Sequence, residues 1–314
     1  MSHNGNFLDD HRVLVSGFID LHCHGAVGVD VNGATAVELL SVGEFLASKG
    51  VAAWLPTLVP DSDEAYMRVI SAIDEAMERQ AGTAAAQIAG VHYEGIFANE
   101  KMCGALRPQF FRDGRWLADG GRLPKLKRGV HMTTMAPEID GGIDVVKHLV
   151  SDDWVVSIGH TRANVDTLDA AFDAGARHIT HFYNAMTGIH HRDLGVAGWA
   201  LTKKGVSIDI IADGIHVEPR MLKLACGQKG VDDVCLISDS VAPTGLGDGK
   251  FELWGETVEV VNGRTRNERG SIAGSVITMM DAVRQMLELG YSEDDVRKMA
   301  CENPARVAGI SLDA

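Results

Sequence analysis

Two histidines one residue apart end the apolar segment GFIDLHCHG, which covers residues 17–25. Side chains two positions apart on a strand point to the same face, so His22 and His24 face one way and Cys23 faces the other. Imidazole and carboxylate groups suit zinc, iron, manganese or cobalt, and two imidazoles on one face can bind the same ion. The pair therefore predicts a metal site at the end of a strand.

Four more residues of this chemistry lie at the ends of other apolar runs: Glu94 in AQIAGVHYE, His160 in WVVSIGH, His181 in HITHF and Asp239 in DVCLISDS. In a parallel barrel the carboxyl ends of the strands form the active site. Three or four ligands that leave one position open are typical of a catalytic metal site rather than a structural one. Four other histidines lie within or beside their runs and are interpreted as structural: His92, His131, His148 and His178.

Short apolar runs alternate with longer amphipathic segments, a pattern typical of repeated βα units. The expected strands are residues 12–22, 51–59, 86–94, 129–137, 154–160, 178–182, 206–214 and 233–240. Helices are expected between them at 35–49, 63–79, 143–150, 164–174 and 218–226, and after them at 276–289 and 292–301. Eight such strands predict an α/β fold, a (β/α)8 TIM-type barrel.

We expect residues 1–314 to form a single barrel domain with a metal site. Residues 1–12 read as a polar leader without the apolar segment of an export signal. After the eighth strand, residues 250–270 contain the pair Asn262–Gly263 between β-rich runs, which predicts a β-hairpin. We interpret this segment as an excursion over the barrel mouth.

The composition excludes several classes of function. A formal net charge of −14 without a basic run argues against a nucleic-acid partner. No run of about 18 apolar residues is present, so we expect no membrane span. Five scattered cysteines without CxxC spacing favour reduced thiols and a cytoplasmic location. The expected partner is a small-molecule substrate.

Nine segments in order resemble the amidohydrolase superfamily, and within it the N-acetylglucosamine-6-phosphate deacetylases. They are GFIDLHCHG, EGIF, MAPE, GHTRA, THFYNAM, IADGIHV, LISDSVAPTG, IAGSVITM and NPARVAGI. The resemblance implies metal-dependent hydrolysis of the acetamide of N-acetylglucosamine 6-phosphate, or of a close N-acetyl amino sugar phosphate, to acetate and the amino sugar phosphate. It also implies a homodimer, because in this family a neighbouring subunit commonly helps to hold the phosphate.

The resemblance further implies a divalent metal site of one or two ions, zinc, iron, manganese or cobalt. The principal ion would be held by Glu94, His160 and His181. A second ion would be held by His22 and His24, with Glu94 bridging the two. Asp239 would be the general base and acid, although an aspartate after a strand could also cap a helix.

Four residues are implied in substrate binding: Asn184, Ala185, Arg192 and His216. His216 would lie near the carbonyl or the sugar, and the other three would contact the phosphate. Arginine suits phosphate because its planar guanidinium donates two hydrogen bonds at once. Because HHRDLG reads as a loop, Arg192 could instead be a solvated surface residue.

The sequence departs from the family pattern, and the departures at positions 96 and 106 keep other functions open. Ile96 replaces the proline of EGPF, Leu106 stands where the family has a histidine that contacts the sugar, and LISDS replaces the commoner TDA. The small flanking β-domain of the family is also expected to be absent or reduced. The alternatives are an amidohydrolase of a different amide, either cyclic or an N-acyl amino acid, and a non-catalytic barrel that binds a sugar phosphate.

Overall fold

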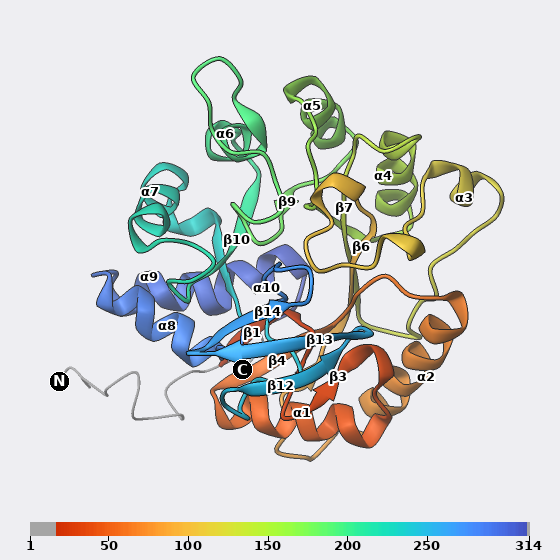
Figure 1. The fold of residues 1–314 in the computed structure, drawn as a ribbon, viewed down its shortest axis with the longest axis vertical. Helices are drawn as coiled ribbons and strands as arrows, with labels where there is room; N and C mark the ends of the chain where they lie inside the picture. Colours follow the sequence, from red (N-terminus) through yellow and green to blue (C-terminus); the bar gives the residue numbers. More distant parts are fainter. Residues whose placement is uncertain (1–16, 313–314) are drawn as a thin grey trace.

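Eight parallel strands rich in β-branched residues form the centre of the computed structural model, which describes residues 17–312 (Figure 1). Each strand pairs with the next one along the chain. The strands are β1 (Phe18–Cys23), β4 (Val51–Leu58), β6 (Gly90–Phe97), β7 (Val130–Met135), β8 (Val155–Ile158), β9 (His178–Ile179), β10 (Ser207–Ile211) and β11 (Val234–Ile237). All eight expected strands are confirmed, although residues 12–16 of the first lie outside the described part.

Hydrogen bonds between the first strand and the segment after the last one close the barrel. The Asp239 amide donates to the His22 carbonyl over 2.9 Å, and the His24 amide donates to the Ser240 carbonyl over 2.8 Å. The buried carboxylate of Asp20 accepts the Ser238 hydroxyl (2.5 Å) and the Ser238 amide (3.2 Å). The predicted (β/α)8 TIM-type barrel is therefore confirmed.

One helix follows each strand and lies outside the ring of strands (Figure 1). These helices are α1 (Ala36–Ser48), α2 (Asp63–Arg79), α3 (Gly114–Ala118), α4 (Gly142–Ser151), α5 (Val165–Asp173), α6 (Gly195–Thr202), α7 (Pro219–Lys229) and α8 (Met279–Glu288). A capping box marks the start of two of these helices: Thr35 with Glu38 before α1, and Thr278 with Asp281 before α8. Helix α6 was not predicted from the sequence, because seven of its eight residues are buried and the segment therefore has no amphipathic pattern.

The last helical segments of the described part are α9 (Glu293–Arg297), a π-helical turn (Lys298–Glu302) and α10 (Asn303–Ala308). The predicted helix at 292–301 covers the first two of these, but α10 was not predicted. Ala305 and Ala308 pack with Ile19, Met132 and Ile237 from the barrel strands. This helix therefore completes a small core of its own against the barrel.

The segment after β11 forms a three-stranded antiparallel sheet rather than one hairpin. Its strands are β12 (Gly249–Leu253), β13 (Glu256–Val261) and β14 (Arg264–Asn267). The predicted pair Asn262–Gly263 makes the second turn, and Trp254–Gly255 makes the first. Both turns have positive φ at both residues, which matches the right-handed twist of the strands.

Three short strands complete the described part: β2 (Gly25–Ala26), β3 (Val29–Asp30) and β5 (Gln87–Ile88). Within residues 17–312, no helix has the length and apolar character that a membrane crossing needs. That residues 1–314 form one domain stays a prediction.

Candidate active site

The six residues predicted from strand ends meet at one mouth of the barrel. His22 lies in β1, His24 follows it, Glu94 lies in β6, and the others follow β8, β9 and β11. The backbone adopts left-handed conformations at His160 (φ 47°), His181 (φ 34°) and Asp239 (φ 49°). Residues other than glycine rarely adopt this conformation, and backbone strain of this kind is concentrated at functional sites.

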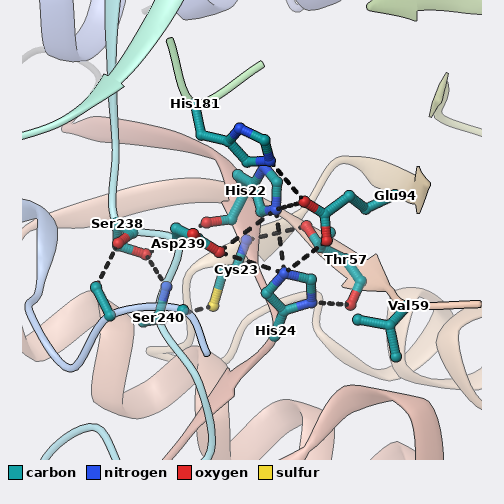
Figure 2. Close-up of polar contacts among 12 residues, drawn as sticks. His22, Cys23, His24, Thr57, Val59, Glu94, His181, Ser238, Asp239 and Ser240 are labelled. Atoms are coloured by element: carbon teal, nitrogen blue, oxygen red, sulfur yellow. Dashed lines mark hydrogen bonds and ion pairs between the residues drawn. The ribbon is translucent and has the colours of Figure 1, made fainter. Parts of the chain in front are cut away.

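These side chains form two clusters, one of His22, His24 and Asp239 and one of Glu94, His160 and His181. Figure 2 shows the Glu94 carboxylate facing His22, His24 and His181. Glu94 Oε1 lies 3.0 Å from the Nε2 atoms of both His160 and His181, and 3.4 Å from Nε2 of His22. Glu94 Oε2 lies 3.3 Å from His24 Nε2. Asp239 Oδ1 completes the second cluster, 3.3 Å from His24 Nε2 and 3.5 Å from His22 Nε2.

The donor atoms fit a divalent metal ion. The Nε2 atoms of His22 and His24 are 3.1 Å apart, and those of His160 and His181 are 3.0 Å apart. Two nitrogens held 2.0–2.1 Å from one tetrahedral zinc would be separated by about 3.3 Å. Imidazole and carboxylate donors at this spacing therefore match the prediction of a divalent metal site.

Two of the histidines have their tautomer set by backbone carbonyls. Nδ1 of His24 donates to the Thr57 carbonyl over 3.1 Å, and Nδ1 of His160 donates to the Met102 carbonyl over 2.7 Å. A proton on Nδ1 leaves the Nε2 lone pair free for a metal, which is how outer partners orient ligand histidines. Thr57 and Met102 act here through main-chain atoms, so residue types in the sequence could not reveal them.

Buried charge dominates the electrostatics of the site. Burial opposes protonation of His24, but the carboxylates of Asp239 and Glu94 outweigh burial and raise its pKa to about 10. In the same way Glu94 raises the pKa of His181 to about 9 despite burial. Burial alone would raise the pKa of Asp239, but the nearby His22 and His24 lower it overall. Without metal, the carboxylates of Glu94 and Asp239 therefore lie beside the protonated imidazoles of His24 and His181.

Two histidines that were interpreted as structural, His178 and His92, lie next to the predicted metal ligands or their partners. His178 Nε2 lies 3.0 Å from Asp209 Oδ2, while Asp209 Oδ1 accepts the backbone N–H of His181. His92 bridges the Leu21 carbonyl (3.0 Å) and the Thr134 hydroxyl (2.8 Å), and its ring lies 4.7 Å from that of His22. Both histidines are buried and neither belongs to a metal-ligand cluster of the described residues.

The clusters open into a cavity of about 320 Å³. Three of the predicted substrate residues line it: Asn184, Ala185 and His216. Arg192 does not, because it is exposed and its guanidinium contacts the His191 ring. No lysine or arginine of residues 17–312 lines this cavity. Of the departures, Leu106 lines the cavity and Ile96 is buried in the main core.

Among the residues that sequence reasoning missed, Asp213 and Trp254 contact predicted site residues. The Asp213 carboxylate accepts Nδ1–H of His216 over 2.6 Å and also accepts the backbone N–H groups of Ile215 and His216. The DGIH spacing of three residues could have indicated this pair. Trp254 packs edge-on against the His24 ring at 5.1 Å, and no local pattern announces that contact.

Comparison with known proteins identifies close relatives. The chain is 34% identical over 302 residues to an N-acetylgalactosamine-6-phosphate deacetylase of Escherichia coli O157:H7, covering 96% of this chain and 79% of that protein. It is also 34% identical over 307 residues to an N-acetylglucosamine-6-phosphate deacetylase of Bacillus subtilis, covering 95% of this chain and 76% of that one. No family model matches the chain.

A solved structure shares the fold. It is a variant of the N-acetyl-D-glucosamine-6-phosphate deacetylase of Mycobacterium smegmatis in complex with N-acetyl-D-glucosamine-6-phosphate. The match has a TM-score of 0.83 and 32% identity, and it covers 94% of this chain and 77% of the other.

Proposed function

This chain belongs to the N-acetylglucosamine-6-phosphate deacetylase family of the amidohydrolase superfamily, and we propose that it hydrolyses the acetamide of N-acetylglucosamine 6-phosphate. A close N-acetyl amino sugar phosphate is equally compatible, since one relative is named for the galactosamine sugar. The observation that carries the proposal is that two histidine–carboxylate clusters, one of which includes Asp239, meet at one cavity.

We assign the proton transfers to Asp239. When bound, a divalent ion supplies Lewis acidity, which polarises a carbonyl and lowers the pKa of water to about 7. The pKa of Asp239 is lowered, so its carboxylate is free to accept a proton from the attacking water. It then donates that proton to the amide nitrogen as the carbon–nitrogen bond breaks. The products are acetate and the free amine.

We assign the metal ligands to the two clusters. Glu94, His160 and His181 would hold the principal ion, and His22 and His24 would hold a second ion beside it. The position of Glu94, within 3.4 Å of Nε2 atoms in both clusters, supports a bridging role. Zinc, iron, manganese and cobalt all suit this mixture of donors.

The phosphate is proposed to lie at Asn184 and Ala185, with His216 nearer the sugar or carbonyl. This part of the cavity offers polar groups but no cation from residues 17–312. Arg192 lies exposed on a loop that follows the same strand, β9. A homodimer in which Arg192 enters the neighbouring subunit's cavity would supply the missing charge, and we propose that arrangement. The cytoplasmic location stays a prediction.

Acetate release tests the proposed activity. The substrates are N-acetylglucosamine 6-phosphate, N-acetylgalactosamine 6-phosphate and unphosphorylated N-acetylglucosamine, each with protein loaded with zinc, iron or manganese and with metal-free protein. We expect metal-dependent turnover of a phosphorylated sugar. Asp239→Asn should lower kcat about 10²- to 10⁴-fold while the metal content stays the same. Unchanged turnover in that variant would remove the proton transfer from Asp239.

Mixing two variants, one impaired in substrate binding and one in turnover, tests the shared phosphate site. Arg192→Ala should raise KM for the phosphorylated sugar, and a dimer that combines an Arg192→Ala subunit with an Asp239→Asn subunit should regain one complete cavity. Refolding the two variants together should therefore restore about a quarter of wild-type activity by random pairing, measured at substrate concentrations well below the raised KM of Arg192→Ala. No gain on mixing would contradict the proposed exchange of Arg192 between subunits.

A second candidate is hydrolysis of a different amide, and the apolar Leu106 in the cavity favours it. Metal-dependent turnover of a cyclic amide or an N-acyl amino acid, without turnover of the sugar phosphates, would establish this alternative. A sensor without activity would bind the sugar phosphate and hydrolyse none of these substrates.

A further inference from the structure

We infer that Leu106 and Trp254 form an apolar wall that receives the acyl group of the substrate and limits its length. The inference rests on the proposed amide hydrolysis and adds a specificity-determining surface to it. Leu106 lies in the loop after β6 and is 2% exposed, and Trp254 lies in the turn between β12 and β13. Both side chains line the cavity.

The wall is continuous and reaches the metal ligands. Leu106 packs with Val59, Ala98, Phe111 and Trp254 in one apolar cluster. The Trp254 ring contacts the His24 ring edge-on, with centroids 5.1 Å apart. An acyl group whose carbonyl lies at the metal ligands would therefore meet indole and leucine side chains directly beside it.

Polar contacts hold the wall in place. Trp254 Nε1 donates to Asp30 Oδ1 over 3.3 Å. Arg269 Nη2 donates to the carbonyls of Ala105 (3.0 Å) and Leu106 (3.3 Å), while its Nε lies 2.9 Å from Glu256. These contacts join the three-stranded sheet to the β3 end and to the loop after β6. Leu106 and Trp254 therefore cannot move away from the cavity without breaking these hydrogen bonds.

The order of the strands sets the direction of the substrate. Leu106 follows the third strand of the barrel and His216 follows the seventh, which places them on opposite sides of an eight-stranded mouth. Asn184 and Ala185 follow the sixth strand, on the His216 side. A sugar phosphate held there has its amide nitrogen toward the polar side, so the methyl group of the acetamide points toward Leu106 and Trp254.

The cavity is small for a ligand pocket. Its volume of about 320 Å³ is at the lower end of the roughly 300–1,000 Å³ that ligand pockets span. One methylene in an apolar pocket changes kcat/KM by about 10- to 200-fold. We therefore expect the wild-type protein to prefer N-acetyl over N-butyryl substrates by at least about 100-fold.

The test compares kcat/KM for N-acetyl- and N-butyrylglucosamine 6-phosphate in metal-loaded protein. Trp254→Ala and Leu106→Ala should each reduce the acetyl preference at least about tenfold, because each opens the wall. Trp254→Phe keeps an aromatic ring there and should retain most of the preference. Trp116→Ala, a tryptophan outside this cavity, is the matched control and should keep the wild-type ratio. Circular dichroism and metal content check that each variant is folded and loaded.

A second measurement separates this inference from the proposed function. Acetate and butyrate binding to the metal-loaded variants is followed by NMR, which needs no turnover of any amide. The wild-type protein should prefer acetate, and Trp254→Ala should lose that preference. If no sugar phosphate is hydrolysed but this preference changes as expected, the proposed substrate is wrong and the wall stands. Ratios that stay at the wild-type value in both Trp254→Ala and Leu106→Ala would overturn the wall.

Discussion

Metal binding to the metal-free protein should release about two protons per subunit near neutral pH. The pKa of His24 is raised to about 10 and that of His181 to about 9, because their carboxylate neighbours outweigh burial. Both imidazoles therefore carry a second proton at pH 7.5. A doubly protonated imidazole has no lone pair for a metal, so each of these protons must leave when an ion binds.

Two displaced protons give a steep pH dependence. While both are bound, each rise of one pH unit should increase the apparent affinity about 100-fold, tenfold for each proton. The slope should fall as the pH passes through about 9 and about 10, the two raised pKa values. Stability of the metal-free fold has the opposite sign. The raised pKa values stabilise it fully below the ordinary histidine pKa of 6.5, and this stabilisation is lost as the pH rises through 9 and 10.

Isothermal titration calorimetry with Mn²⁺, in buffers of different ionisation enthalpy, counts the protons directly. His24→Asn should lower the count by about one. His131→Asn is the matched control, because burial lowers the pKa of His131 and it lies outside both ligand clusters. A count near zero for the wild-type protein, with an affinity that stays constant from pH 7 to pH 8, would refute the reasoning.

Three further variants test the cavity and the packing of the fold. Asp213→Asn replaces the carboxylate that holds Nδ1–H of His216, and should lower kcat/KM about 10- to 150-fold at constant metal content; an unchanged value would deny Asp213 a positioning role. Gly90→Ala would bring a methyl group to 2.1 Å from the Val130 carbonyl oxygen and should destabilise the fold by about 1–3 kcal/mol in urea unfolding. Gly227→Ala, in a helix with open space around it, should instead stabilise by about 0.5–1 kcal/mol, and a loss there would contradict the comparison.

The sequence determined the barrel and the chemistry of its mouth because both depend on local periodicity. Each apolar run of strand length, and the polar residue that ends it, can be recognised from a short segment of the sequence. Parallel strands in a barrel bring their carboxyl ends together, so Glu94 and His181 could be expected near His22 although 72 or more positions separate each from it in the chain. The turn at Asn262–Gly263 could also be predicted, because an Asn-Gly pair between β-rich runs is a local signal.

Only the tertiary structure decided the contacts that join distant segments through main-chain atoms or packing. The carbonyls that orient His24 and His160 belong to Thr57 and Met102, and backbone groups carry no residue-type signal. The helix α6 was hidden because burial on all sides removes amphipathic periodicity. Trp254 reaches His24 only because the sheet β12–β14 folds back over the mouth, a contact between positions 230 residues apart that no local pattern encodes.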